Sequence, residues 1–254
     1  MIPIKNAREI EAMRVSGAMA REILEESALL CVPGLTTREL DRLVAEKIKE
    51  RGAESAFLGY RGFPGNCCIC IDDEVVHGFG KERRLQYGEV VKLDIGIRYK
   101  GWIGDTAMSV AVGAVSPEVE RLMQVTEESL LLAISKARAG ARVGDVSAAV
   151  ERHVTSYGYS VVKEFVGHGV GKRLHEEPQI PNFGEAGKGP KLKPGMTIAI
   201  EPMVNMGKAA VIFHDDNWTV SAADGMPSAH FEHTILVTSG EAEILTCAKK
   251  MVLK

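Results

Sequence analysis

Apolar residues recur every three or four positions in four segments of the chain, which is the spacing of an α-helix with one buried face. These segments are residues 7–30, 36–51, 117–138 and 143–157. Two of these segments start with residues that favour helix N-termini. These are Thr36 or Thr37 at the start of the second segment, and Ser116 immediately before Pro117, the first residue of the third. The pattern therefore predicts four helices, arranged as two consecutive pairs.

Short runs rich in valine and isoleucine, several with alternating polar positions, follow each helix pair and are typical of strands. They are residues 67–71, 75–77, 89–98, 102–112, 161–166, 196–205, 209–213, 218–221 and 231–237. Glycine, aspartate and proline separate the runs, which favours tight turns and antiparallel pairing. We therefore expect an α+β protein in which each half has two helices followed by antiparallel strands.

The two halves also repeat each other in sequence pattern. Residues 33–52 align without gaps on residues 139–158. In both halves a glycine precedes an acidic residue by six positions, and these pairs are Gly88 with Asp94 and Gly195 with Glu201. The period is too long for a solenoid, whose repeats span about 20–50 residues.

This repeat predicts a single domain over residues 1–254, built from two related halves at approximately 7–112 and 116–238. Duplicated halves usually pack about a pseudo-twofold axis, and ligand sites tend to form at the interface between them. Asp94 and Glu201, one from each half, could meet at such an interface.

Composition excludes several classes of protein. The net charge is −3 and the pI about 6.2, with scattered basic residues, so neither nucleic acid nor an anionic membrane is an expected partner. The N-terminal segment is charged, and no run of eighteen apolar residues occurs. Five cysteines, three of them at Cys67, Cys68 and Cys70, do not form a disulfide framework in a chain of this size. We expect a cytoplasmic protein with reduced thiols.

Acidic residues interrupt several of the apolar strand patterns. Asp94 and Asp105 flank a turn at Tyr99-Lys100-Gly101, so a hairpin would bring their carboxylates near one another. The second half contributes His168 within GHGVG, together with Glu201 and Glu232, which also follow or begin apolar runs. Ionised carboxylates are costly to bury without compensating charge.

Two divalent cations would balance these four carboxylates, and the imidazole would complete a site rich in oxygen ligands. Such a ligand set favours Mn, Fe or Co over a structural zinc site rich in sulfur. Paired ions of this kind activate water and polarise a carbonyl, which is the chemistry of metal-assisted amide hydrolysis. His77 and His175 lie beside glycines and a proline turn, and each is a candidate for stabilising a tetrahedral intermediate or an ordinary surface or core histidine.

Spacing excludes other motifs. GHGVGKR is one residue short of a P-loop, and HEEPQ lacks the second histidine of H-E-x-x-H. Taken together, the segments VVHGFG, VVKLDIG, GWIGDTA, EFVGHGVGKRLHEEP, MTIAIEPMV and FEHTILVT closely resemble those of the type I methionine aminopeptidases. The resemblance covers nearly the whole chain. It implies a pita-bread fold, in which two pseudo-twofold related αα-β halves share an antiparallel sheet with helices on its outer face.

The resemblance implies a function in N-terminal methionine excision during protein maturation, by hydrolysis through a water or hydroxide that bridges two metal ions. Co, Mn or Fe would be bound, with Zn also acceptable. Five residues match the metal ligands of the family, with the second and the last of them bridging: Asp94, Asp105, His168, Glu201 and Glu232. Glu201 would handle the proton of the bridging water, while His77 and His175 would contact the substrate amide.

The methionine side chain would enter an apolar pocket formed by the residues that match Tyr60, Phe63, Cys68 and Trp218, which without the family would be interpreted as core. Three departures bear on the site. Phe57 stands where the family commonly has cysteine, and Leu174 where it commonly has an aromatic residue. Asp72 and Asp73 replace an asparagine-containing turn that often helps to bind a monovalent cation near Ser228.

Other interpretations share the fold. Prolidases and aminopeptidases P use the same metals, but they typically carry a sizeable N-terminal domain for which this chain has no room. Relatives that have lost their metals, as binding proteins or as metal-free enzymes of creatinase type, would have no reason to retain four acids in apolar strands. The short chain, without an insertion between His168 and Glu201, indicates a bacterial-type enzyme. From the resemblance we expect a monomer that associates transiently with the ribosome and acts on the N-terminal methionine of its substrates.

Overall fold

The computed structural model describes residues 2–247. Its α-helices are α1 (Ala7–Ala28), α2 (Thr37–Glu50), α3 (Pro117–Lys136) and α4 (Val143–Ser156). All four expected helices are confirmed, with each start within one residue and each end within two of the sequence prediction. The Thr36 hydroxyl accepts a hydrogen bond from the Glu39 amide, and Ser116 caps α3 with Pro117 at its first position.

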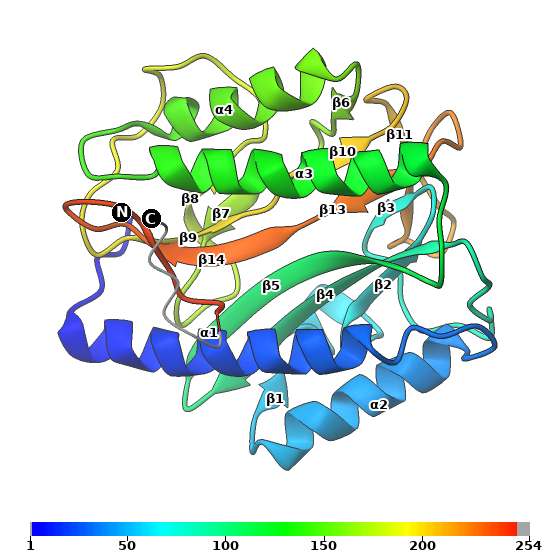
Figure 1. Ribbon diagram of the computed structural model, residues 1–254. Coiled ribbons are helices and arrows are strands. Elements are labelled where there is room, and N and C mark those ends of the chain that lie inside the picture. The colour runs from blue at the N-terminus through cyan, green and yellow to red at the C-terminus, as the bar shows by residue number, and fades with distance from the viewer. Residues whose placement is uncertain (1, 248–254) are drawn as a thin grey trace.

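An antiparallel sheet, whose strands differ in length, runs through both halves of the molecule (Figure 1). Its main path follows the order β1 (Glu54–Ser55), β4 (Val90–Tyr99), β5 (Trp102–Ala111), β14 (Glu232–Leu236), β9 (Thr197–Ile200), β7 (Gly167–Gly169) and β8 (Glu176–Ile180). Two further strands join it: β2 (Cys68–Ile71) pairs with β4, and β15 (Glu243–Ile244) pairs with β14.

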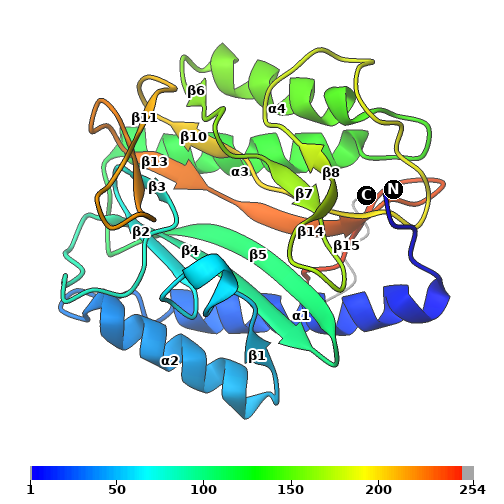
Figure 2. The same ribbon diagram turned by 180° about the vertical axis from the view of Figure 1, so that it is seen from behind.

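The two halves of the chain meet where β5 pairs with β14. On either side of this junction the central strand pairs with a strand of its own half, β5 with β4 and β14 with β9. β4 and β9 therefore occupy matching places in the order β4-β5-β14-β9. The helices cover one face of the sheet, with α1 and α2 over the first half and α3 and α4 over the second. Seen from behind, the sheet lies in front of these helices, and on its opposite face the described chain places a short 3-10 helix (Tyr60–Gly62) but no α-helix (Figure 2).

Two smaller three-stranded sheets flank the main one. The first has the order β13 (Ser228–His230), β10 (Met203–Asn205) and β6 (Ser160–Val161). The second has the order β11 (Val211–Phe213), β12 (Val220–Ala222) and β3 (Glu74–Val76). Because β3 belongs to the first half and β12 to the second, this sheet also joins the two halves.

Some of the expected strands were wrong in extent. The run 161–166 is not one strand, since β6 ends at Val161 and the chain continues as a loop to β7. The run 196–205 is divided at Pro202, which has no backbone N–H to donate to a ladder. The run 231–237 begins only at Glu232, and the sequence pattern gave no indication of β7, β8, β13 or β15.

Each half has its own apolar core between its helix pair and its strands. The core of the first half includes Leu24, Leu40 and Ile95, and that of the second includes Leu130, Val150 and Ile198. A third cluster lies between the halves and contains aromatic residues from the loop after β1. This third cluster forms one wall of the candidate site.

Candidate metal centre

The hairpin of β4 and β5 positions the two acidic residues of the first half. Lys100 and Gly101 form its turn with φ values of 48° and 83°, as a type I′ turn requires. The register sets Asp94 opposite Ala107 and Asp105 opposite Gly96, so both carboxylates point to the same face. The expected hairpin is thus confirmed, and a small residue stands opposite each acid.

The second half brings its acids to the same place. Glu232 pairs with Ala107 from the other side, which puts Asp94 and Glu232 on either flank of that alanine. Reciprocal hydrogen bonds fix this junction: the Thr234 hydroxyl donates to the Asp105 carbonyl at 2.8 Å, and the Thr106 hydroxyl donates to the Glu232 carbonyl at 2.9 Å.

Glu201 follows β9 at the point where the chain bends into the smaller sheet. The residue before it, Ile200, pairs with His233, and Met203 beyond the bend pairs with His230. The Glu201 carbonyl accepts a hydrogen bond from the Asn182 amide at 3.0 Å. The bend therefore lies level with Glu232 and turns the Glu201 side chain toward the other acids.

His168 projects from β7 next to a register shift in its pairing with β8. Its Nδ1 is 2.9 Å from the Gly169 carbonyl, so that Nδ1 carries the proton and Nε2 presents a lone pair. Nε2 lies 3.6 Å from Asp105 Oδ2 and 3.4 Å from Glu201 Oε1. Ligand atoms about 2.0–2.2 Å from a shared metal ion stand roughly 3.0–3.6 Å apart, so these distances suit common coordination.

Burial makes ionisation of the acidic side chains in this cluster energetically unfavourable. It raises the pKa of Asp94 to about 7, and it raises the pKa values of Asp105, Glu201 and Glu232 well above their usual range, with mutual repulsion adding to the effect. Burial also lowers the pKa of His168 to about 3, which keeps that imidazole neutral and able to bind a metal.

The residues fit divalent cations. Asp94 Oδ1 and Glu201 Oε1 are buried and accept no hydrogen bond from the described residues, so each has a lone pair available. Asp105, His168 and Glu232 have ligand atoms within 4.8 Å of one another, and all three are buried. Hard cations with oxygen and imidazole ligands would supply the positive charge that the buried acids lack.

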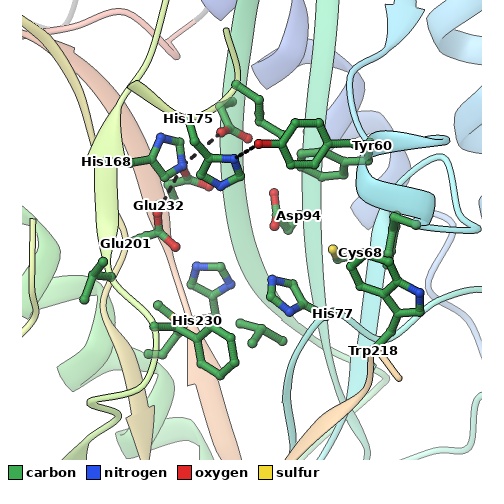
Figure 3. A pocket seen from close by; sticks show the side chains of 18 of the residues that line it. Tyr60, Cys68, His77, Asp94, His168, His175, Glu201, Trp218, His230 and Glu232 are labelled. Carbon is green, nitrogen blue, oxygen red and sulfur yellow. Dashed lines mark hydrogen bonds and ion pairs between the residues drawn. The ribbon is translucent and has the colours of Figure 1, made fainter. Parts of the chain in front are cut away.

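A cavity of about 320 Å³ opens above these acids (Figure 3). All eleven residues singled out from the sequence line it: Tyr60, Phe63, Cys68, His77, Asp94, Asp105, His168, His175, Glu201, Trp218 and Glu232. His168, Glu201 and Glu232 lie on one side, Cys68 and Trp218 on the other, and Asp94 lies between them. The structure therefore brings the expected residues together, while their individual roles stay predictions.

The two other candidate histidines differ in their surroundings. His175 is exposed, and its Nδ1 lies 2.8 Å from the Tyr60 hydroxyl. His77 follows β3 with φ 62°, a strained backbone conformation outside glycine, and its ring packs edge-on against Phe165. Burial lowers the pKa of His77 to about 4. The pKa of His175 is also lowered, by partial desolvation of its ring and then by the Arg61 charge.

The apolar wall is an edge-to-face cluster of rings centred on Phe63, with centroids 5.1 Å from Trp218 and 6.4 Å from Phe57. Phe57 packs on Gly96, where an added Cβ would come within 2.3 Å of the ring. Leu174 also lines the cavity. Two of the three departures from the family pattern, Phe57 and Leu174, therefore line the cavity.

Sequence reasoning missed several residues of the cavity, among them Arg61, Phe165, Met203 and His230. His230 is buried, and its Nε2 has no hydrogen-bond partner among the described residues. Its position two residues before Glu232 was the only available signal. All five cysteines are free thiols, as expected, and none of the described helices is long and apolar enough to cross a bilayer.

Comparison with known proteins defines the class. Residues 11–239 match metallopeptidase family M24. The chain belongs to this family, and as such it is a hydrolase that uses a divalent metal.

Among curated relatives, the methionine aminopeptidase of Clostridium perfringens is 45% identical over 249 residues, which cover 98% of this chain and all of the relative. The crystal structure of methionine aminopeptidase from Thermotoga maritima superimposes with a TM-score of 0.95 at 43% identity, over 97% of this chain and 100% of that one. The expected pita-bread fold is thereby confirmed.

More distant structures share the fold alone. A prolidase from Pyrococcus horikoshii matches with a TM-score of 0.78 at 22% identity, and the match spans 98% of this chain but only 65% of the prolidase. The remaining third of the prolidase lies outside the match.

Proposed function

We propose that this protein is a methionine aminopeptidase, which removes the initiator methionine from proteins and peptides. The observation that carries the proposal is that one cavity is lined both by four acids with His168 and by Cys68 with several aromatic rings. Relatives at 45% identity over nearly the full chain that are named for this activity support it. In this proposal residues 1–254 act as one catalytic domain of two related halves.

Two divalent ions would be held by the side chains of Asp94, Asp105, His168, Glu201 and Glu232. The oxygen-rich ligand set favours Mn, Fe or Co and also accepts Zn. When bound, such ions supply Lewis acidity that activates water and polarises the scissile carbonyl.

The protein's own residues would then move protons and hold the substrate. The Glu201 carboxylate, near the cavity and without a hydrogen-bond partner on Oε1, accepts the proton of the attacking water and passes it to the departing amine. His175, whose ring is held by the Tyr60 hydroxyl, and His77 contact the substrate amide and the developing oxyanion.

The side-chain pocket selects methionine through shape and polarisability. Tyr60, Phe63, Cys68 and Trp218 present ring edges and a thiol, which suit a flexible thioether. Burial raises the pKa of the Cys68 thiol, so that this wall stays uncharged at neutral pH. Phe57 also lines this cavity and packs edge-to-face against Phe63.

Release of the first residue from three tripeptides tests the proposal. Metal-stripped protein, with and without added Mn or Co, is given Met-Ala-Ser, Leu-Ala-Ser and Ala-Pro-Ala. Metal-dependent release of methionine alone is expected, with activity lost in Glu232→Ala and retained in Glu46→Gln, a control at an exposed ion pair. Cleavage of Ala-Pro-Ala in preference would assign the proline-specific activity instead, and metal binding without any cleavage would indicate a binding protein.

We further propose that the enzyme acts in the cytoplasm as a monomer, on chains that emerge from the ribosome. The five reduced cysteines suit a reducing compartment. Sedimentation of the purified protein, and its recovery with ribosomes at low and high salt, test the last two statements.

A further inference from the structure

Lys92 lies buried in the sheet next to the cavity, with 1% of its surface exposed. It is two positions before Asp94 on β4, so its side chain leaves the same face of the sheet. Its Nζ donates a hydrogen bond to the Asp72 carbonyl at 2.6 Å. Within residues 2–247 no carboxylate forms an ion pair with this ammonium, so a backbone carbonyl is its hydrogen-bonding partner.

The turn at Asp72 is a point where backbone hydrogen bonds connect the two halves of the molecule. Its carbonyl also accepts the Ser228 backbone N–H from β13 at 2.9 Å. Its own N–H donates to the Val90 carbonyl at 2.9 Å, and its carboxylate Oδ1 accepts the Val90 N–H at 2.9 Å. The next residue, Asp73, accepts the Ala222 N–H from β12 at 2.8 Å.

The backbone segments that carry two cavity histidines adjoin this turn. β3 starts just after the turn and leads directly into His77, while β13 carries Ser228 and ends at His230. A positive charge on the Asp72 carbonyl therefore holds the backbone segments that aim both rings into the cavity. The acidic residues Asp73 and Glu74 lie near enough to offset part of the cost of burying this charge.

We propose that the Lys92 ammonium takes the place of the auxiliary monovalent cation that the family resemblance leads one to expect beside Asp72 and Ser228. A sodium or potassium ion on the same carbonyl would meet a like charge at close range, and repulsion at a buried site disfavours both occupants. This chain therefore positions His77 and His230 with a covalently attached cation and needs no dissolved one. Lys92 acts here as a positioning residue.

Simple space filling does not account for this residue. Burying an ammonium costs more than burying an apolar side chain of equal length, which would pack as well. The charge is retained where a carbonyl from the turn points at it, which is the ligand type of a small monovalent cation.

Thermal unfolding of metal-stripped protein tests the inference without reference to catalysis. Wild type, Lys92→Met and Lys92→Ala are compared in potassium, sodium and choline chloride at equal ionic strength, with Lys47→Ala as a control for loss of a surface lysine. Potassium or sodium should raise the Tm of Lys92→Ala alone, by about 3–8 °C over choline, because only this variant has space for an ion. The other three proteins should unfold at the same temperature in all three salts.

A second experiment measures kinetics and depends on the proposed function. Wild-type kcat/KM for Met-Ala-Ser, with the divalent metal present, should agree within twofold in the three salts. Lys92→Ala should lose at least tenfold in choline and recover most of this loss in potassium or sodium, whereas Lys92→Met should not recover. A recovery that depends on the ion is a result that loss of packing alone would not produce.

Two results would overturn the inference. One is a wild-type Tm or rate that rises to saturation with potassium or sodium, which would show that an ion binds despite Lys92. The other is a Lys92→Ala protein that responds to none of the three salts. If Lys92→Ala does not fold, the salt response of wild type decides. Failure of wild type to release methionine in any salt would refute the proposed function and leave the unfolding experiment valid.

Discussion

Replacing Asp94 by asparagine should stabilise the metal-free protein at neutral pH, although it removes a proposed metal ligand. Asparagine keeps the size of the side chain and carries no charge. The carboxylate of Asp94 is buried beside Asp105 and has one oxygen without a partner among the described residues. In the absence of a cation, its ionisation in the folded state is therefore unfavourable.

The magnitude follows from the pKa of this group. Burial raises the pKa of Asp94 from 3.8 to about 7, so the folded protein resists ionisation more than the unfolded chain does. The stability linked to the protonated form is complete below pH 3.8 and is lost as the pH rises to 7. The loss amounts to about 4 kcal/mol at neutral pH, since one pKa unit corresponds to about 1.4 kcal/mol.

Unfolding by urea in the presence of EDTA, at pH 4 and pH 7.5, measures this difference. The variant should equal wild type within about 1 kcal/mol at pH 4 and exceed it by up to about 4 kcal/mol at pH 7.5, or by roughly 8–16 °C in Tm. Added Mn should stabilise wild type more than the variant. A variant that gains nothing relative to wild type between these pH values would refute the reasoning.

Two further substitutions test the surroundings of the metal centre. Tyr60→Phe removes the hydroxyl that holds His175 at 2.8 Å, and kcat should fall by roughly 3–10-fold with little change in Tm, since one hydrogen bond is worth about 1 kcal/mol; a change confined to KM would contradict the assigned positioning role. Gly96→Ala places a Cβ within 2.3 Å of the Phe57 ring and should cost about 1–3 kcal/mol in urea unfolding; combining it with Phe57→Ala should restore part of this loss, and an equal loss in the double variant would show that the clash is not the cause.

The elements that were predicted well are those whose structure is determined by residues close together in the sequence. Helical spacing located α1 to α4 closely, and N-cap residues marked the starts of α2 and α3, because periodicity and N-cap chemistry act within a few residues. The strand β8 was missed because Glu176–Ile180 is mostly polar and contains a proline, and its pairing with β7 comes from the tertiary structure.

The candidate site was predictable at positions where an acidic residue stands in a segment whose apolar pattern predicts burial. Asp105 and Glu232 interrupt apolar strands, and the cost of burying their charge is by itself a reason to expect a bound cation. His230 and Lys92 gave no such signal, since a single polar residue in an apolar run can face either side of a sheet. Their surroundings depend on the turn at Asp72 and on the junction of the two halves, which local spacing does not encode.

Methionine release during a titration of metal-stripped protein with Mn tests the central claim most directly. With Met-Ala-Ser as substrate, wild type should be inactive in EDTA and should gain activity with added Mn until the site saturates. Asp105→Asn, which keeps the shape of the buried side chain, should release no methionine at any Mn concentration. Activity of wild type that persists in EDTA, or activity of Asp105→Asn that matches wild type, would contradict the account.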